Sequence, residues 1–438
     1  MLFSREIPVK KSVDICNACG SASGGGAAGV TAAVAAARAG AKVYLAEALG
    51  MFGGLGTAGG VPVYMTFTDG INFCADGLGR EIKDRMNAEF NLCSGGRGIN
   101  PEKLKRIYDD MCSEAGVDFS FFTDFIGAES NGRNVTHAIF SSKSGIFAIE
   151  AKVFIDCSGD AELTTRAGGE YMYGNEKGEV MPGTVCSHWA NIDWQKLRNS
   201  GVSVYQQLLK AFDDHIFRNN DPHHTGISQT ANTLGGGNMG HIFGLNPLSE
   251  ESLTAGMVEG RKQSVEFQNF YRKYVPGYEG TELTFTASIM GVRASRRAVG
   301  DYILCIEDYR TKRIFDDEIG RYCYPVDIHP SSTDKEEQEK FQKLYSIHYA
   351  PGESYGIPYR SLVVKSFDNM LVAGRCVSSD QYMQASVRTM PGCYILGQAA
   401  GLAAALAVAK NGMVRDIDVK ELQRGLKKMG AFLPNFNE

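Results

Sequence analysis

The stretch that decides the fold of this chain reads Gly24-Gly25-Gly26-Ala27-Ala28-Gly29, and an alanine-rich segment then leads to Val43-Tyr44-Leu45-Ala46-Glu47. Glycines spaced G-x-G-x-x-G allow a tight turn, a close approach of the backbone to a pyrophosphate and close packing of the next helix on a sheet. The first turn of that helix offers free N–H groups to phosphate oxygens. Glu47 is spaced to accept hydrogen bonds from an adenosine ribose. This order predicts a dinucleotide site, and the alternative is a turn with only a structural role.

The segment before the glycines departs from the standard pattern, which has an apolar strand running directly into them. Here Val13-Asp14-Ile15-Cys16 is followed by small and polar residues up to Ser23. Two explanations stay open for Cys16–Ser23: a longer loop or a poorly formed first strand. Under either explanation, the strength of cofactor binding is open. Cys16 and Cys19 have the spacing of a redox or metal site. Because no second cysteine pair or nearby histidine completes a zinc set, we predict no metal site.

The composition is that of an ordinary globular protein of 438 residues, long enough for two or three domains. A net charge of -5 gives no reason to expect nucleic acid as a partner. We find no apolar run of membrane-spanning length and no signal-peptide core, so we expect a cytoplasmic protein without a membrane span. The eleven cysteines are odd in number and form no regular framework, so we expect mostly reduced, buried thiols.

The order of patterns along the chain predicts two helices in residues 76–116, the second beginning at Asn100-Pro101 with asparagine as N-cap. Turns at Asn131-Gly132 and Lys143-Ser144-Gly145 then predict a three-stranded meander. It leads into a strand that ends at Ser158-Gly159-Asp160. After residue 358 the early style returns, with a strand running into Gly374-Arg375 and a second apolar helix from Met390 to Ala409.

The region between residues 166 and 358 is more polar and contains both tryptophans and seven of the eight histidines. We interpret it as an inserted domain. The predicted fold class is therefore α/β, with a discontinuous Rossmann-like FAD-binding domain (residues 10–165 and 359–438) and an inserted mixed α+β substrate domain (residues 166–358). The identity of the dinucleotide as FAD comes from a resemblance to a known family.

The chain resembles the FAD-dependent oxidoreductases of the glutathione-reductase structural class, in particular a broad bacterial family of mostly uncharacterised flavoproteins. Five segments carry the resemblance: Gly24–Glu47, Leu49–Gly60 with Thr66–Gly70, Ile155–Asp160, Gly291–Arg297, and Tyr355–Gly401. The resemblance implies FAD as the cofactor and leaves the substrate open, since the family spans several chemistries.

Carried over by position, the resemblance implies a set of cofactor contacts. The pyrophosphate would face the first glycine run, and the ribose would face Glu47. The later segments would line the ribityl chain, the adenine side and the flavin. A helix beginning at Pro391-Gly392 would point its positive end at flavin N1 and C2=O, which favours hydride acceptance. The full set of implied cofactor residues is Gly24, Gly26, Ala28, Gly29, Glu47, Gly53, Gly54, Thr57, Ser158, Gly159, Asp160, Gly374, Arg375, Pro391 and Gly392.

The candidate catalytic residues are mainly arginines, because a guanidinium grips a carboxylate or polyol with two hydrogen bonds. Arg293, Arg360 and Arg388 lie in family-like segments, and structural pairing is the alternative for each. His241 lies in a glycine-rich stretch that would present it to a pocket as a base. Tyr359 would donate a hydrogen bond to a substrate oxygen.

The favoured function is a dehydrogenase or oxidase that takes a hydride from a small polar organic substrate onto flavin N5. Alternatives are a flavin monooxygenase and a flavin-binding protein without turnover of its own. Hydroxylases usually carry a Gly-Asp pair after the late strand, whereas this chain has Gly374-Arg375. An NAD-dependent dehydrogenase would lack the late flavin-facing helix. The sequence leaves the electron acceptor, covalent attachment of FAD and the oligomeric state open.

Overall fold

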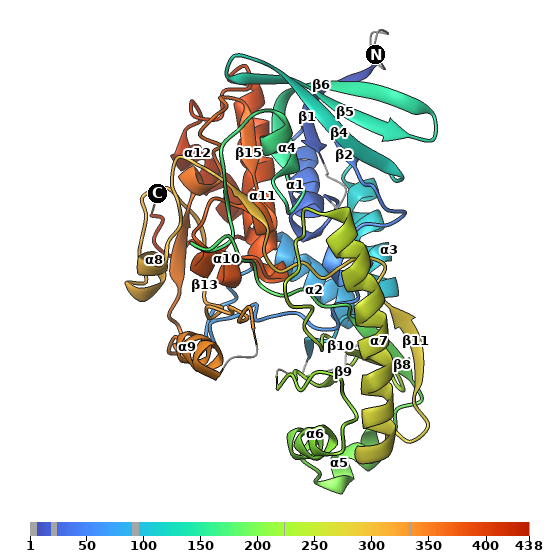
Figure 1. Ribbon diagram of the computed structural model, residues 1–438. Helices are drawn as coiled ribbons and strands as arrows, with labels where there is room; N and C mark the ends of the chain where they lie inside the picture. Colours follow the sequence, from blue (N-terminus) through green and yellow to red (C-terminus); the bar gives the residue numbers. More distant parts are fainter. Residues whose placement is uncertain (1–6, 19–23, 90–95, 223, 333–334, 438) are drawn as a thin grey trace.

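Parallel strands organise the part of the molecule that carries the glycine-rich stretch (Figure 1). The computed structural model describes residues 7–18, 24–89, 96–222, 224–332 and 335–437. Five strands run parallel in the order β3-β2-β1-β6-β15. Their bounds are β1 Val9–Ala18, β2 Val43–Ala46, β3 Asp118–Ser120, β6 Gly145–Asp156 and β15 Met370–Val372. The carboxyl ends of these strands share one edge, where ligands of open α/β sheets bind.

The first strand is fully formed, which corrects one of the two explanations for the unusual segment before the glycines. β1 spans ten residues and pairs along its length with β6, with Cys16 opposite Phe154 and Ala18 opposite Asp156. Burial explains this, because Ile15, Cys16 and Asn17 are fully covered and their backbone groups need sheet partners. The other explanation, a longer loop, falls on residues 19–23, which lie outside the described residues.

Two apolar helices, α1 (Ala27–Arg38) and α11 (Met390–Val408), pack directly on each other over the sheet (Figure 1). A Cβ at Gly397 or Gly401 would overlap the carbonyl oxygens of Ala28 and Ala32 on α1. Glycine therefore allows the two backbones to touch, which holds the N-termini of both helices at the same edge of the sheet. By length and composition α11 would suit a membrane, but 83% of its most apolar stretch is buried inside the protein, as in a core helix.

The predicted meander and the predicted pair of helices are both present. Antiparallel β4 (Thr123–Asn131) and β5 (Asn134–Ser142) extend the sheet from β6, with left-handed glycines at the turns, Gly132 and Gly145. Two helices, α2 (Leu78–Glu89) and α3 (Pro101–Glu114), pack on the same core, and the Asn100 side chain caps α3. The short α4 (Glu162–Arg166) follows β6.

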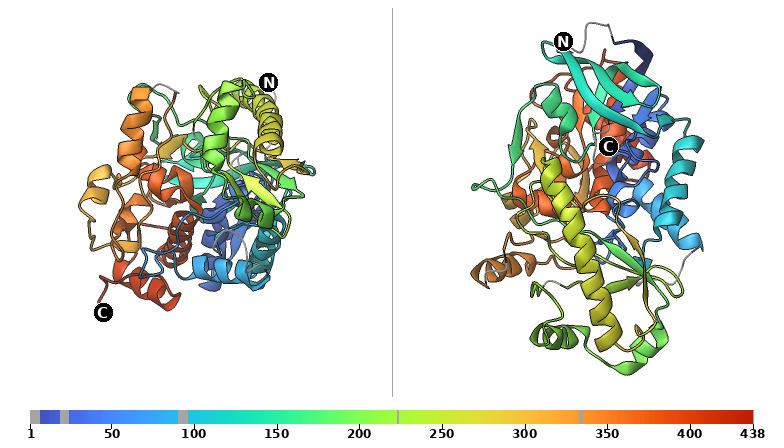
Figure 2. Two further views of the ribbon diagram at one scale, coloured as in Figure 1. Left: turned by 90° about the horizontal axis from the view of Figure 1, so that it is seen from below. Right: turned by 45° about the vertical axis from the view of Figure 1, so that its right-hand side comes forward.

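The inserted region forms a separate antiparallel sheet with its own aromatic core (Figure 2). Its strand order is β11-β8-β10-β9, and the long helix α7 packs against it. Trp189 and Trp194 lie buried in that core. The bounds are β7 Tyr171–Tyr173, β8 Ser187–Ala190, α5 Trp194–Ser200, α6 Val204–Asp213, β9 Ile227–Gln229, β10 Gly235–Gly237, α7 Glu250–Tyr274, β11 Glu282–Thr286 and β12 Arg296–Ala298.

The segment after β12 returns to the cofactor-binding half. Buried side chains between residues 304 and 326 belong to the same hydrophobic core as α1 and α11. The domain division at residues 166 and 358 stays a prediction. The remaining bounds are α8 Ile306–Arg310, β13 Glu318–Tyr322, α9 Lys335–Tyr345, β14 Tyr355–Pro358, α10 Gln381–Val387 and α12 Val419–Lys428.

Candidate functional site

A cavity lies at the N-termini of α1 and α11. Segments from both ends of the chain line it, although they are more than 300 residues apart in sequence. The lining residues are Gly26, Ala27, Ala28, Gly53, Gly54, Leu55, Cys157, Ser158, Gly159, Val292, Gly374, Arg375, Arg388, Met390 and Cys393. Eight of the cofactor residues implied by the resemblance are on this wall. Gly24, Gly29, Glu47, Thr57, Asp160, Pro391 and Gly392 lie next to it in sequence or behind it.

The two helices that face the cavity lack side-chain caps. The N-cap of α1 is Gly26, which has no side chain. The N-cap of α11 is Thr389, and its hydroxyl does not bond the first turn of the helix. By contrast, Asn100, Ser203 and Ser249 cap α3, α6 and α7 with their side chains. Free N–H groups and a positive helix end therefore lie at two places on one cavity. This arrangement can bind an anionic group at each place.

Backbone at this cavity also needs glycine. Gly374 has a φ of 87° and Gly53 a φ of 107°, which L side chains rarely adopt. A Cβ added at Gly374 would also lie only 3.1 Å from the Ala28 Cβ. A Cβ on Gly29 would overlap the carbonyl of Gly24, so the opening turn can close only with glycine there. The glycines thus keep the floor of the cavity free of side chains.

Glu47 lies behind the first glycine run. Its carboxylate accepts hydrogen bonds from the N–H groups of Gly25 and Leu49, each at 2.8 Å. Burial raises the pKa of Glu47 to about 7, although these backbone donors act in the opposite direction. The carboxyl group ties the glycine turn to the end of β2, and its contact to a ribose stays a prediction.

Three polar side chains of the implied set are hydrogen-bonded within the protein. The Thr57 hydroxyl donates to the Phe52 carbonyl at 2.6 Å, and the Ser158 hydroxyl donates to Asp156 at 2.6 Å. Asp160 forms an ion pair with Arg375 at 2.7 Å. Arg375 also donates to the carbonyls of Gly159 and Val292. Arg375 therefore joins the end of β6 to the inserted region at the cavity wall.

Arg388 brings a positive charge to the cavity wall. Its Nη2 donates to the backbone carbonyl of Asp327 at 3.1 Å, and the buried Nε has no hydrogen-bond partner among the described residues. Arg293 lies close by and donates to the Pro182 carbonyl and the Thr184 hydroxyl at 2.8 Å. Burial, followed by the neighbouring charge of Arg388, lowers the pKa of Arg293 to about 10. Arg388 therefore places a guanidinium on the cavity wall, with the guanidinium of Arg293 near it.

His241 does not border this cavity but connects to it through other residues. Its Nε2 lies 2.9 Å from Nδ1 of His329, and its Nδ1 lies 3.0 Å from a carboxylate oxygen of Asp221. His329 in turn approaches Asp327, the residue that holds Arg388. Asp221 and His241 border a second, small cavity, together with rings such as Phe217 and Phe267.

Two candidate catalytic residues are held elsewhere. The Tyr359 hydroxyl donates to the Val414 carbonyl at 2.7 Å, and Arg360 pairs with Asp317 at the surface. Neither residue lines the cavity at the N-termini of α1 and α11, which we call the FAD-side cavity because the resemblance places FAD there. Their family-like segment forms β14 and the turn after it, so its role in the structure is to complete the core.

The sequence interpretation missed several residues of the cavity wall and of the contacts behind it. Leu55, Val292, Met390 and Cys393 line the cavity, and Asp327 with His329 lie behind Arg388. Apolar wall residues have no chemical signature in a sequence. Asp327 and His329 had one weak signal, a carboxylate and an imidazole two residues apart. Among the described residues, no cluster of three or more His, Cys, Asp or Glu is arranged to hold a metal, and the nine described cysteines are free thiols.

The glycine-lined cavity with an uncapped helix end at two places fits a dinucleotide that carries negative charge on its pyrophosphate and gains it on its ring when reduced. Such a site on this α/β fold defines the class of dinucleotide-binding oxidoreductases. The chain belongs to the FAD dependent oxidoreductase family, whose model matches residues 23–426. It is therefore an FAD-dependent enzyme, and FAD is its cofactor.

Solved structures of other flavoproteins are similar to this one at low sequence identity. A geranylgeranyl bacteriochlorophyll reductase-like protein from Thermoplasma acidophilum has a TM-score of 0.45 at 12% identity, over 96% of this chain and 83% of the other. The myxobacterial chondrochloren halogenase has a TM-score of 0.44 at 11% identity, over 96% and 78%. p-Nitrophenol 4-monooxygenase from Pseudomonas putida has a TM-score of 0.36 at 10% identity, over 68% of this chain and 70% of the other. Comparison with curated protein sequences found no match.

Proposed function

We propose that this enzyme oxidises a small polar organic substrate that carries an anionic or strongly hydrogen-bonding oxygen, as a dehydrogenase or oxidase. The observation that supports it is the buried Nε of Arg388 on the cavity wall, which has no hydrogen-bond partner in the part of the chain that the structure describes. A buried donor without a partner costs free energy of roughly 1–3 kcal/mol, so a ligand oxygen that accepts from it binds favourably. The charge of Arg293 close behind strengthens the preference for an anionic oxygen.

The chain's own residues have separable roles in this proposal. The first turn of α1, with Gly53, Gly54 and Gly374, holds the cofactor, and FAD supplies a hydride acceptor when it is bound. The N-terminus of α11 stabilises negative charge that develops near it. Arg388 orients the substrate by its oxygen, which places the reacting carbon in a fixed position.

The finer assignment to the glutathione-reductase structural class belongs to the same proposal. The parallel order β3-β2-β1-β6-β15, the meander after β6 and the late helix α11 support it. The cytoplasmic location and a small-molecule substrate are likewise part of what we propose.

An anaerobic reduction screen tests the function. Purified, FAD-loaded protein is mixed with hydroxy acids, sugars and amines, and loss of the oxidised flavin absorbance is followed. Bleaching by one such substrate, with product formed in the absence of oxygen, is the expected result. Bleaching only by NAD(P)H, followed by insertion of oxygen into the substrate, would establish a monooxygenase instead. A protein that holds FAD but is reduced by neither would be a flavin-binding protein without turnover.

A further inference from the structure

Two buried imidazoles and two partly exposed carboxylates form a continuous row between the inserted region and the cavity at the N-termini of α1 and α11. Nδ1 of His241 lies 3.0 Å from Asp221, and Nε2 of the same ring lies 2.9 Å from Nδ1 of His329. The row continues from Nε2 of His329 to Asp327 at 3.5 Å. Asp327 then contacts Arg388 on the cavity wall at 3.4 Å. Each ring nitrogen therefore faces either a carboxylate or the other ring.

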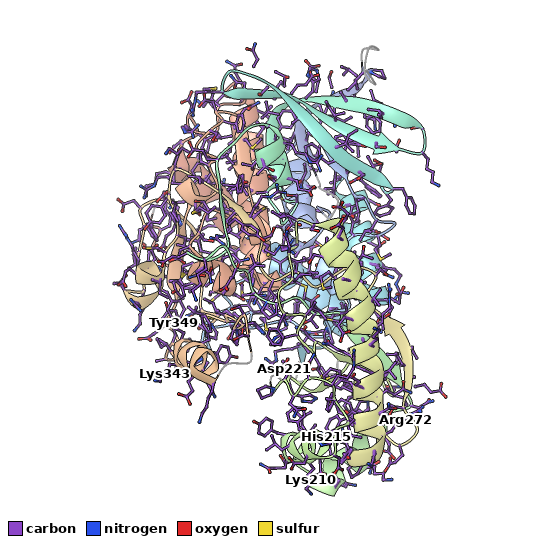
Figure 3. All side chains as sticks on the ribbon, in the orientation of Figure 1. Lys210, His215, Asp221, Arg272, Lys343 and Tyr349 are labelled. Carbon is purple, nitrogen blue, oxygen red and sulfur yellow. The ribbon has the colours of Figure 1, made fainter. Side chains whose placement is uncertain are left out.

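The two ends of the row are more accessible than its middle. The His241 side chain is 0% exposed and that of His329 7%, whereas Asp221 is 11% and Asp327 22% exposed. Asp327 lies behind Arg388, and Asp221 borders the second cavity. Asp221 lies between the α5–α6 end of the molecule and the cofactor-binding half (Figure 3). The imidazoles thus connect two separate places through a region without water access.

Counting protons shows what this row can do. A hydrogen bond between the rings uses one proton, and a neutral pair carries two protons on four nitrogens. The second proton therefore occupies only one of the outer nitrogens, either Nδ1 of His241 or Nε2 of His329. The other outer nitrogen is a bare lone pair facing a carboxylate, so it is a ready proton acceptor. The two arrangements differ by the passage of one proton through the row.

The groups around His241 act on its pKa in both directions. Burial lowers the pKa of His241, Arg293 acts in the same direction, and Asp221 and Asp327 oppose them. Asp327 itself stays ionised, because its pKa is held low by His329, Arg388 and Arg293 against the effect of burial. Other polar groups near the row are the Tyr324 hydroxyl, which donates to Asp327, Gln263, which donates to the His241 carbonyl, and Glu266 in the second cavity.

We propose that His329 and His241 are a proton relay, which removes the proton released in the FAD-side cavity and delivers it to Asp221 in the second cavity. The inference rests on the proposed function, because oxidation of a hydroxyl or amine group releases one proton along with the hydride. The relay adds a route that the substrate cavity alone does not provide. Asp327 and Asp221 are its entry and exit, and none of the four residues needs to touch the substrate.

The protons balance along the row. The relay begins with protons on Nδ1 of both rings, and Nε2 of His329 is bare. The Asp327 carboxylate takes up the proton as an O–H and passes it to Nε2 of His329, where the N–H bond forms as the O–H bond breaks. The proton on Nδ1 of His329 then passes to Nε2 of His241, and the one on Nδ1 of His241 leaves to Asp221. One proton enters, one leaves, and no electrons move in the row.

Nitrogen NMR of FAD-loaded, substrate-free protein labelled with ¹⁵N-histidine tests the relay without turnover. In the wild type, we expect each ring to report the same two titration steps, because the steps of two coupled rings belong to the pair. In His241→Gln, the midpoint of His329 is expected to shift by about one pH unit. His137 is a matched control, since it pairs with Glu129 at 3.4 Å without a second imidazole. Independent titration of the two rings would overturn the relay.

Anaerobic reduction by the substrate found in the screen supplies the second test. His329→Gln and His241→Gln are expected to lower the reduction rate by about 10²-fold, within the range of proton-transfer catalysis, and to retain FAD absorbance. Asp221→Asn, which changes only the exit, should lower the rate and reduce its solvent deuterium isotope effect. His137→Gln should leave the rate unchanged. Equal rates in wild type and relay variants would overturn the relay, whereas failure of every substrate to reduce FAD would refute the proposed function and leave the NMR test standing.

Discussion

The phenol oxygen of Tyr322 lies 2.7 Å from the hydroxyl oxygen of Thr389, the N-cap residue of α11. Threonine at an N-cap ordinarily accepts a hydrogen bond from the first turn of its own helix. Here the hydroxyl is held by β13 through Tyr322 and bonds none of those N–H groups. The positive end of α11 is therefore kept free for a ligand in the cavity.

Replacing Tyr322 by Phe tests this arrangement. Without the phenol, the Thr389 hydroxyl is free to cap α11, so less positive potential is left for reduced FAD. We expect the two-electron midpoint potential to become more negative by roughly 10–20 mV, which corresponds to about 0.5–1 kcal/mol. Potentiometric titration with a reference dye measures it. Tyr355→Phe removes a similar buried bond, to Ser386, and should leave the potential unchanged. Equal shifts in the two variants would contradict the idea.

Arg388→Ala should retain the flavin absorbance and lose substrate-driven bleaching. The loss of a guanidinium that orients an anionic oxygen is expected to slow reduction by about 10²-fold or more. Arg388→Lys keeps the charge but not the fork of donors, so it should recover only part of the rate. Arg360→Ala is the control, because Arg360 pairs with Asp317 at the surface. Unchanged bleaching in Arg388→Ala would remove this residue from the site.

The Arg375–Asp160 pair predicts a structural effect on FAD binding. Arg375→Met leaves the largely buried Asp160 without its partner, and breaking such pairs costs about 3–5 kcal/mol. We expect that loss in denaturant unfolding, together with weaker FAD retention on gel filtration. The double variant with Asp160→Asn removes the unpaired charge and should regain part of the stability. Additive losses would show that the two residues are not coupled.

Glu47 predicts a dependence of stability on pH in protein stripped of FAD. Its folded-state pKa is raised to about 7, so the folded state binds more protons than the unfolded state between pH 4.5 and 7. Stability from this group is therefore present at low pH and lost as pH rises through that window, by up to about 3 kcal/mol. Glu47→Gln should flatten this part of the stability profile. An unchanged slope in urea unfolding across the window would contradict the raised pKa.

Replacing Gly401 tests how much the close packing of α11 on α1 contributes to stability. A Cβ there overlaps the Ala32 carbonyl, which is backbone and cannot move aside. Gly401→Ala should therefore destabilise the protein by about 1–3 kcal/mol despite the better helix propensity of alanine. Gly425→Ala in α12 is the control, since a Cβ there meets only the end of the Leu402 side chain. Thermal unfolding measures both, and equal midpoints would refute the close packing.

Much of the cofactor half could be predicted from local pattern. The spacing of Gly24, Gly26 and Gly29, the apolar helix after them and Glu47 indicated strand, helix and strand, and each lies where the pattern placed it. The capped start of α3 at Asn100 is also a local signal. The expectation of a weak first strand was wrong, because polar residues in β1 gain sheet partners on both sides once β2 and β6 are in place.

The catalytic candidates were harder to predict. Arg388 and Arg360 both lie in the family-like segment Tyr355–Gly401. In the structure, Arg388 lines the cavity, whereas Arg360 forms an ion pair at the surface. His241 lies 88 residues from His329, so no local pattern connects the two rings. Their contact depends on how the inserted region docks on the segment after β13.

By itself, the sequence determined the class of fold and the kind of cofactor, because G-x-G-x-x-G spacing and helical periodicity are local properties of the chain. Only the tertiary structure decided which charges face the cavity, that the N-terminus of α11 is left uncapped, and that Asp221, His241, His329 and Asp327 form one row. The physical reason is that burial and pairing depend on contacts between residues far apart in the chain. Those contacts are made only when the sheet, its two helices and the inserted region pack together.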